Sequence, residues 1–174
     1  SFAATIEEAT ASLEVKNYAA AQSIAEQLAR NGDVQAMMIL GKLYQDGDGV
    51  TRDLAAAMAW YGKAAEANHA PAQRALALIH LGGGLGSVDY DKESSLMRKA
   101  AEAGDAEAQF NMGLLASGAF DNPPEWIDAA RWFRLAAEKG FAAAQHQLGV
   151  LYLEGKGVGK NAVTAGQWLA KAAE

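Results

Sequence analysis

Apolar residues between positions 36 and 44 follow the spacing of an α-helix that buries one face. Ala36, Leu40, Leu43 and Tyr44 stand at i, i+4, i+7 and i+8. A second stripe, at i, i+3, i+4 and i+7, follows a glycine-containing stretch and consists of Ala57, Trp60, Tyr61 and Ala64. The two stripes predict a pair of antiparallel helices joined by a turn.

The same pair recurs along the chain with a period of 36 residues and no insertion. One column holds alanine, one holds larger apolar residues and one holds small residues. The alanines are Ala36, Ala72, Ala108 and Ala144, the larger residues are Leu40, Leu76, Met112 and Leu148, and the small ones are Gly41, Ala77, Gly113 and Gly149. Small residues predict close helix contacts, and the aromatic column of Trp60 and Trp132 is expected to fill the gaps between units. Repetition at a fixed period is the signature of stacked helix pairs.

A glycine or asparagine stands just past the second helix of each unit, at Gly32, Asn68, Gly104 and Gly140. These residue types accept the left-handed conformation that ends a helix. Upstream, residues 15–33 match a second helix, and residues 3–14 predict its partner across a shorter turn. We therefore predict an all-α solenoid of about five antiparallel helix pairs. It forms a single domain over 1–174, with an N-terminal pair at 1–33 and repeats at 34–70, 71–106, 107–142 and 143–174.

Composition and charge narrow the classes of partner. The 174 residues, 51% of them hydrophobic and 21% charged, suffice for a folded domain with a substantial core. A net charge of -6 with scattered Lys and Arg disfavours nucleic acid or an anionic membrane surface as the main partner. No apolar run is long enough for direct membrane insertion. Because the chain has no cysteine, disulfides, thiolate zinc sites and cysteine nucleophiles are excluded.

The repeated letters resemble those of the Sel1-like repeat family, relatives of the tetratricopeptide repeats. The pattern A-x3-L-G-x2-Y-x2-G-x-G-V-x2-D, followed by A-x2-W-Y-x-K-A-A-E, is matched almost letter for letter over 36–66 and well over 144–174. The middle copies depart, with His80 and Ala116 in the tyrosine column. The resemblance implies a right-handed superhelical stack that works as a non-catalytic protein-protein interaction scaffold or adaptor. Bacterial signalling, polarity or cell-envelope organisation is the implied setting.

By analogy with the tetratricopeptide repeats, the first helices are expected to line a concave surface that binds a peptide or helix. The inward-facing positions implied by the resemblance are Met38, Lys42, Gln45, Arg74, Leu78, Leu81, Phe110, Leu114, His146 and Val150, with Gln35, Glu107, Ser117 and Leu153 beside them. Phe110 is the expected anchor. An alternative of equal weight makes Leu78, Leu114 and Val150 part of the core, since most apolar helix positions serve packing.

The stretch YQDGDGV, residues 44–50, invites a different interpretation. Asp46, Asp48 and Asp53 carry the oxygens that a bound cation needs. The counterpart in the fourth repeat, YLEGKGV, keeps both glycines but places Lys156 where the first copy has Asp48. Because an ammonium group cannot replace a cation ligand, we interpret the stretch as a turn that needs its glycines. A cation bound in the first copy alone stays an alternative.

Other chemistry finds little support in the sequence. His69, His80 and His146 occupy three different columns and are not expected to converge on a metal or catalytic site. We therefore predict no cofactor, no metal and no enzymatic activity. The alternative function is a peptidoglycan- or carbohydrate-linked envelope module, which would require exposed tryptophans in the Trp60 column.

The sequence gives the last helix pair no cap, because neither a glycine nor a further helix follows the "AAE" of 172–174. We expect either that the chain is a fragment of a longer protein or that this end packs on another copy, which is self-association. The expected partner on the concave surface is a protein or peptide. The family resemblance favours a bacterial periplasmic or envelope-associated location and leaves a cytoplasmic one open.

Overall fold

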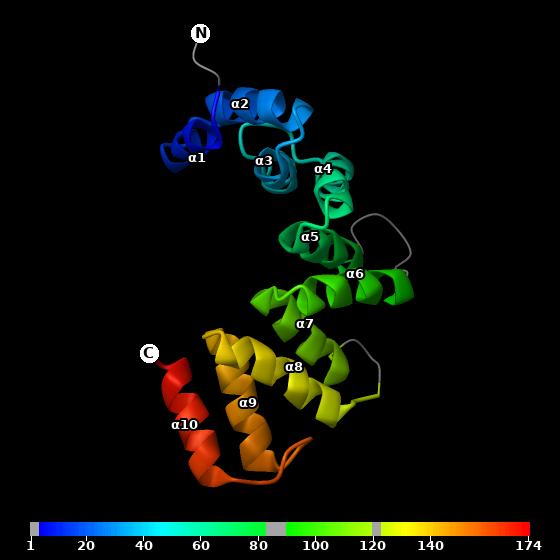
Figure 1. Cartoon of the computed structure of the whole chain (residues 1–174), viewed down its shortest axis with the longest axis vertical. Coiled ribbons are helices and arrows are strands. Elements are labelled where there is room, and N and C mark those ends of the chain that lie inside the picture. The colour runs from blue at the N-terminus through cyan, green and yellow to red at the C-terminus, as the bar shows by residue number, and fades with distance from the viewer. Residues whose placement is uncertain (1–3, 83–89, 120–122) are drawn as a thin grey trace. The chain divides into compact units, whose positions relative to one another are not determined.

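The computed structural model describes residues 4–82, 90–119 and 123–174. Within these ranges the chain forms ten α-helices and no strand (Figure 1). The helices are α1 (Ile6–Glu14), α2 (Tyr18–Arg30), α3 (Val34–Asp46), α4 (Leu54–Glu66), α5 (Ala70–Leu81), α6 (Tyr90–Glu102), α7 (Ala106–Ala116), α8 (Trp126–Glu138), α9 (Ala142–Glu154) and α10 (Ala162–Ala172). We call the first helix of each consecutive pair the A helix and the second the B helix. The predicted all-helical array of five pairs is confirmed.

The chain divides into two compact units, Ser1–Glu93 and Ser94–Glu174. In unit 1 each helix from α1 to α5 contacts the next, and in unit 2 the same holds from α7 to α10. Each core lies between a B helix and the A helix that follows it. In unit 1, Ala25 and Ala29 of α2 pack on Ala36 and Leu40 of α3, and all four are at most 5% exposed.

Short polar side chains stand at the N-cap of most helices and accept a hydrogen bond from the backbone of the first turn. The carboxylate of Asp33 accepts a hydrogen bond from the backbone N–H of Ala36 at 2.9 Å, and Asp53 and Asp105 cap α4 and α7 in the same way. The predicted helix ends are confirmed too. Left-handed backbone follows the B helices, and Asn68, with φ 58°, adopts it as glycines do at the other copies.

The small residue inside an A helix lies directly under a B-helix side chain of the same repeat. A Cβ atom added at Gly41 would stand 2.5 Å from Cε1 of Tyr61, and one at Gly113 would stand 2.5 Å from Cδ1 of Phe133. In the fourth repeat the corresponding contact joins Gly149 and the side chain of Leu169. The glycines are therefore required for the two helices of a pair to approach, as predicted.

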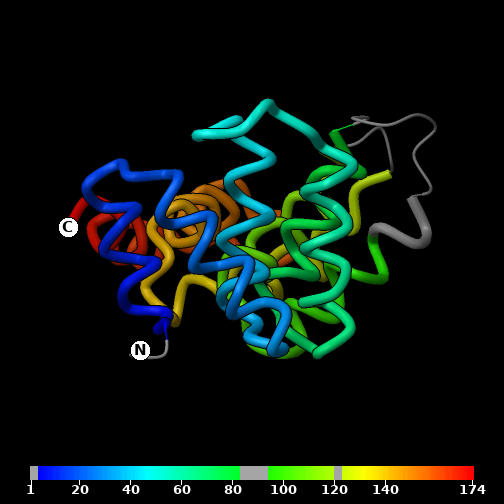
Figure 2. Tube along the Cα trace, turned by 90° about the horizontal axis from the view of Figure 1, so that it is seen from above, coloured from blue at the N-terminus to red at the C-terminus, as the bar shows by residue number. Residues whose placement is uncertain are grey.

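The loop containing YQDGDGV, cyan in Figure 2, is a turn that touches the preceding repeat. Gly47 ends α3 in the left-handed region, with φ 78°. Any Cβ at Gly49 would overlap the side chain of Tyr18, the first residue of α2. Gly157 in the fourth repeat lies equally close to the backbone of Trp126, the first residue of α8. Both glycines of the turn have positive φ, and the second also permits the close approach.

Glutamine side chains join successive repeats, and the sequence interpretation missed them. Gln73, Gln109 and Gln145 are 6%, 4% and 7% exposed, and each follows an alanine as the fourth residue of α5, α7 or α9. Each donates its side-chain amide N–H to the carbonyl of an alanine near the end of the preceding B helix. The acceptors are Ala65, Ala101 and Ala137, at 3.5, 3.0 and 3.2 Å. We call these bonds the glutamine clamps. A buried amide at 36-residue spacing was the signal that would have revealed them.

Candidate functional site

The predicted surface residues fall on one side of the A helices in each unit. In unit 1, Met38, Lys42 and Gln45 stand at i, i+4 and i+7 on α3, and Arg74, Leu78 and Leu81 repeat that spacing on α5. We call these six residues the A-helix face of unit 1. The A-helix face of unit 2 consists of Phe110 and Leu114 on α7 and of His146 and Val150 on α9.

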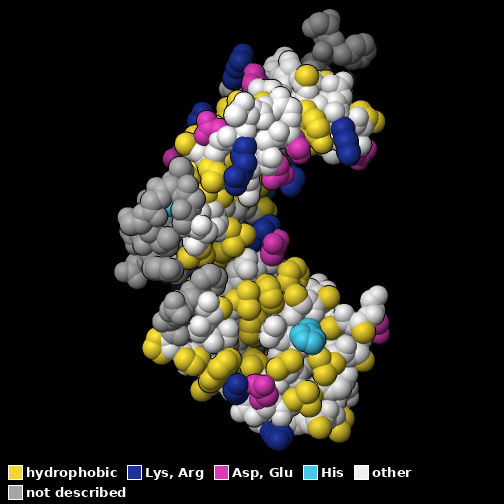
Figure 3. All heavy atoms as spheres, turned by 180° about the vertical axis from the view of Figure 1, so that it is seen from behind, with side chains coloured by type: hydrophobic (Ala, Val, Ile, Leu, Met, Phe, Trp, Pro, Cys, Tyr) yellow, Lys and Arg dark blue, Asp and Glu magenta, His cyan; other side chains and the backbone are white. Residues whose placement is uncertain are grey.

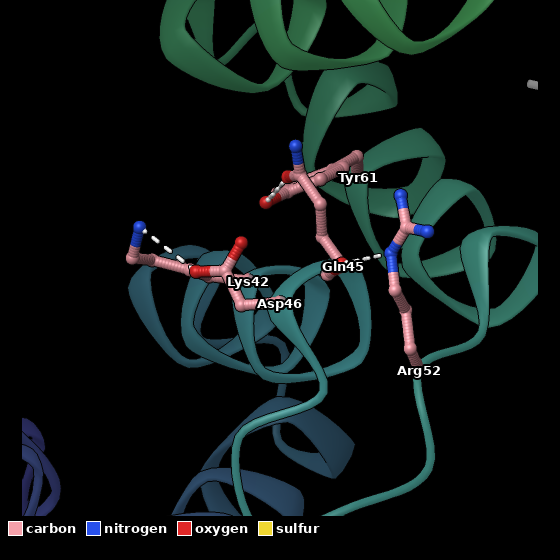
Figure 4. A network of polar contacts seen from close by, with 5 residues as sticks. All are labelled: Lys42, Gln45, Asp46, Arg52 and Tyr61. Carbon is pink, nitrogen blue, oxygen red and sulfur yellow. Dashed lines mark hydrogen bonds and ion pairs between the residues drawn. The ribbon is translucent and has the colours of Figure 1, made fainter.

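Charged and amide groups dominate the α3 part of the unit 1 face. The side chain of Lys42 is exposed, and its Nζ lies 3.2 Å from Oδ2 of Asp46, an exposed i, i+4 pair worth a few tenths of a kcal/mol, about 0.3–0.5. Arg52, from the loop, donates from Nε to the backbone carbonyl of Gln45 at 3.0 Å (Figure 4). Met38 is half-buried and packs on the core cluster of Tyr61 and neighbouring residues.

Gln45 is held in place by a buried tyrosine. Tyr61, on α4, is 3% exposed and donates its hydroxyl hydrogen to Oε1 of Gln45 at 2.8 Å (Figure 4). Burial, reinforced by the carboxylate of Asp46, raises the pKa of Tyr61 to about 12, while Arg74 acts in the opposite direction. The phenol therefore stays a hydrogen-bond donor at neutral pH. With its oxygen engaged, Gln45 has its amide N–H groups left for a ligand.

The α5 part of the unit 1 face mixes one cation with apolar side chains. Arg74 is half-buried, and its charge acts on Tyr61. Leu78 is 38% exposed, and Leu81 is half-buried. Leu78 thus keeps more of its surface open than a core leucine does, whereas Leu81 is intermediate.

The unit 2 face is apolar, and its aromatic residue is partly committed to packing. The ring of Phe110 has its centroid 5.7 Å from that of Phe133 and 5.3 Å from that of Phe141, at tilted angles. Leu114 is half-buried against the same core cluster. The structure thus places Phe110 and Leu114 between the core and the surface, so each retains only part of its area for a partner.

On α9, His146 is exposed, Val150 is half-buried and the neighbouring Leu153 is 43% exposed. Figure 3 shows hydrophobic side chains gathered over one side of unit 2, in the lower half of the view, with few charges among them. The two A-helix faces therefore differ in chemistry, one offering charges and an amide and the other mainly apolar area.

Several of the residues considered for metal or catalytic chemistry have structural roles or belong to different units. Asp53 caps α4, and Asp46 pairs with Lys42. His69 precedes α5 at its N-cap position, and His146 is on α9 in the other unit. Among the residues that the structure describes, no group of three or more His, Asp or Glu side chains could hold a metal ion. Nor is any helix in the described ranges long and apolar enough to cross a bilayer.

The tryptophan column serves the packing of the helices. Trp132 is 4% exposed. Trp60 is half-buried against the core cluster of α2 and α3, and Trp168 is half-buried against that of α8 and α9. A cation from the same helix covers each ring: Nζ of Lys63 lies 4.5 Å from the ring centroid of Trp60, and Lys171 covers Trp168 at 4.7 Å. Rings packed in this way do not form the open stacking ladder that carbohydrate binding would require.

The comparison with protein families settles what kind of repeat this is. The Sel1 repeat profile matches residues 34–69, 70–105, 106–141 and 142–174 in succession. The chain belongs to the Sel1 repeat family. Sel1 repeats commonly serve as non-catalytic scaffolds that mediate protein interactions. Among curated proteins, none matches the chain.

Solved structures of Sel1 repeat proteins share this fold. A Sel1 repeat protein from Oxalobacter formigenes is 32% identical, with a TM-score of 0.89 over 97% of this chain and 69% of that one. The protein c5321, a protective antigen present in uropathogenic Escherichia coli strains and displaying an SLR fold, is 35% identical with a TM-score of 0.82. The match covers 87% of this chain but only 32% of c5321. A putative Sel1 repeat protein from Klebsiella pneumoniae, 24% identical with a TM-score of 0.62 over 95% of this chain and 82% of that one, shares the fold.

Proposed function

We propose that this Sel1 repeat chain is a non-catalytic scaffold whose A-helix faces bind a peptide or helix of another protein. The observation that carries the proposal is that each A helix buries one side and leaves the opposite side exposed or half-buried. In their alanine and leucine columns, Ala36, Leu40, Ala144 and Leu148 are each 0% exposed. The opposite columns carry side chains that are exposed or only half-buried, from Lys42 to His146. Such a surface is free of the packing that holds a solenoid together.

The chemistry of each face restricts what it can bind. On unit 1, the Lys42 ammonium, the Gln45 amide and the Arg74 guanidinium are hydrogen-bond donors beside the apolar Met38 and Leu78. A segment with carboxylates or free backbone carbonyls next to apolar side chains fits that set. On unit 2, the apolar area favours the nonpolar side of an amphipathic helix. The bacterial sources of the similar structures support a bacterial setting for this activity. We propose signalling, polarity or envelope organisation as its context.

Selection from a random peptide library displayed on phage tests this function. We expect peptides enriched on the wild-type chain to lose at least about tenfold in affinity, or about 1.4 kcal/mol, when their site is altered. Lys42→Glu with Arg74→Glu reverses the charges of unit 1, and His146→Glu with Val150→Asp places charge on unit 2.

Arg30→Glu is the matched control, because Arg30 is an exposed cation on the B helix α2. Peptides that bind wild type and both double variants equally would show that the A-helix faces are not the binding surface. Failure to enrich any peptide would count against the scaffold function itself.

A further inference from the structure

Gln45 has a hydrogen-bond donor that the fold leaves unused. Its side-chain oxygen accepts from the Tyr61 hydroxyl at 2.8 Å, and its backbone carbonyl accepts from Nε of Arg52 at 3.0 Å. The amide nitrogen, Nε2, has no hydrogen-bond partner among the residues that the structure describes, and Gln45 is only half-buried. In Figure 4 the side chain of Gln45 extends away from α3, with this nitrogen at its far end. A donor is thus held in a fixed direction at the surface.

The same column of the other repeats offers no such donor. It holds Leu81, Ser117 and Leu153. Leucine has no polar side-chain atom, and the Ser117 hydroxyl donates locally, to the carbonyl of Leu114 at 2.8 Å. Of the four positions in this column, all of which the structure describes, only the first therefore presents an N–H group to a ligand.

The charges around Gln45 favour a neutral acceptor over a carboxylate. Nζ of Lys42 lies 3.2 Å from the carboxylate of Asp46, so its charge is already partly compensated. Burial is the main cause of the raised pKa of Tyr61, and the carboxylate of Asp46 adds to it by more than Arg74 subtracts. The potential beside Tyr61 and Gln45 is therefore unfavourable to a second anion, whereas a carbonyl group carries no net charge.

A main-chain carbonyl is the neutral acceptor that every peptide carries. Inside an α-helix these carbonyls are bonded to the N–H groups of the next turn, and only those at the C-terminal end are open. In an extended segment they have no internal partner. The amide of Gln45 therefore matches an extended segment better than the side of a helix. Met38, half-buried on the cluster that contains Tyr61, supplies apolar contact for the side chains of such a segment.

We propose that Gln45 selects an extended peptide segment at the unit 1 face by donating from Nε2 to one of its main-chain carbonyls. Tyr61 is the positioning residue that holds the amide in this orientation. This role of Gln45 rests on the proposed function and narrows it, because no residue in the column of Gln45 gives unit 2 such a donor. The two A-helix faces thus differ in the conformation of the peptide that they take.

Two phage libraries selected on the whole chain test this role. One displays linear peptides with proline at fixed intervals, which cannot form a helix, and the other varies one face of a stable displayed helix. Clones that bind unit 1 are those weakened by the Lys42→Glu, Arg74→Glu double variant. If neither library yields such a clone, the proposed function itself fails at unit 1.

Gln45→Glu keeps an oxygen for the Tyr61 hydroxyl and replaces the donor by a carboxylate oxygen. We expect linear clones that bind unit 1 to lose at least about tenfold in affinity for this variant, and helical clones to lose less than about twofold. Gln27→Glu is the matched control, because Gln27 is an exposed glutamine on the B helix α2, and it should leave every affinity unchanged. Equal affinity of the linear clones for wild type and Gln45→Glu would overturn the proposal, as would a tenfold loss confined to the helical clones.

The acidic residues of a linear clone are also replaced one at a time by their amides. The ratio of its affinities for wild type and Gln45→Glu should stay the same, because the acceptor is in the main chain. A replacement that abolishes the ratio would contradict the proposal, since a side-chain carboxylate would then be the acceptor.

A double-mutant cycle tests the role of Tyr61. Tyr61→Phe should lower the affinity of such a linear clone about threefold, because the clone must then order the amide itself. In a Gln45→Leu chain the same substitution should have no further effect on affinity. Circular dichroism reports whether each variant is folded. Equal losses in the two backgrounds would reject Tyr61 as the positioning residue, because a purely structural role would act with or without the amide.

Discussion

Tyr61 in unit 1 and Phe133 in unit 2 occupy the same place in their repeats, two periods of 36 residues apart. Each ring lies on the glycine of its own A helix, Gly41 or Gly113, with no space for a Cβ between them. The Tyr61 hydroxyl continues to Gln45 at the surface, whereas the Phe133 ring meets Phe110. In the first repeat the contact therefore continues from the ring to a polar side chain, and in the third repeat it continues to a second aromatic ring.

This difference shows that the packing of a repeat and the chemistry of its surface are set by different atoms. The glycine-ring contact is common to both repeats and holds the helix pair together. The Tyr61 hydroxyl orders the amide of Gln45 beside the A-helix face of unit 1, whereas the Phe133 ring packs on Phe110 beside the face of unit 2. Surface specificity can thus change without any change in the array of helices.

The largest expected effect comes from breaking what the two repeats share. Gly113→Val places a branched side chain where Phe133 lies, and Gly41→Val does the same at Tyr61. Each substitution should lower the free energy of unfolding of its unit by about 3 kcal/mol, because the ring and the helix backbone must move apart. Denaturant unfolding with hydrogen exchange read separately in the two units measures the loss.

Gly62→Val and Gly166→Val are the controls for the glycine substitutions. Both glycines lie in B helices, and nothing would stand within 4 Å of an added Cβ at either. Since valine is a slightly better helix former than glycine, these variants should be as stable as wild type. A loss equal to that of Gly113→Val would show that the glycine-ring contact is unimportant.

A smaller effect is expected from giving unit 2 the chemistry of unit 1. Phe133→Tyr adds a hydroxyl beside Phe110, where no glutamine stands at the position of Gln45. It should lower the free energy of unfolding by about 1–2 kcal/mol. Ser117 holds the place that Gln45 has in the first repeat, so Ser117→Gln in the Phe133→Tyr background should restore part of that stability. A double-mutant cycle measures the coupling, and a coupling energy of zero would contradict the assigned role of the glutamine.

An effect confined to alkaline pH concerns the ionisation of Tyr61. Its pKa is raised to about 12 by burial, against an ordinary 10, so the unfolded chain loses this proton first as pH rises. The stability linked to the neutral phenol is fully present below pH 10 and should be lost between pH 10 and 12. Tyr61→Phe should remove this part of the pH dependence. Identical slopes for both proteins in that range would show that Tyr61 titrates normally.

The array itself could be predicted from the sequence because its determinants repeat. Alanine and glycine columns at 36-residue spacing identify helix pairs, and Asn68 is recognisable as a helix end by its position alone. The Tyr61-Gln45 bond was not predictable, since it depends on which of several polar residues a buried hydroxyl reaches. The role of Phe110 was equally hidden, because helical periodicity does not distinguish a surface aromatic from one that leans on Phe133.

Helix α8 is attached to the fourth repeat at both of its ends. Near its C-terminus the Ala137 carbonyl accepts the Gln145 amide, and at its first residue Trp126 meets Gly157. The two attachments are separated by about 16.5 Å along the helix, at 1.5 Å per residue. A single contact would act as a pivot, whereas two contacts so far apart resist rotation of one pair against the other. Adjacent pairs joined in this way therefore resist bending. The spacing between their A helices would already be fixed before a peptide binds.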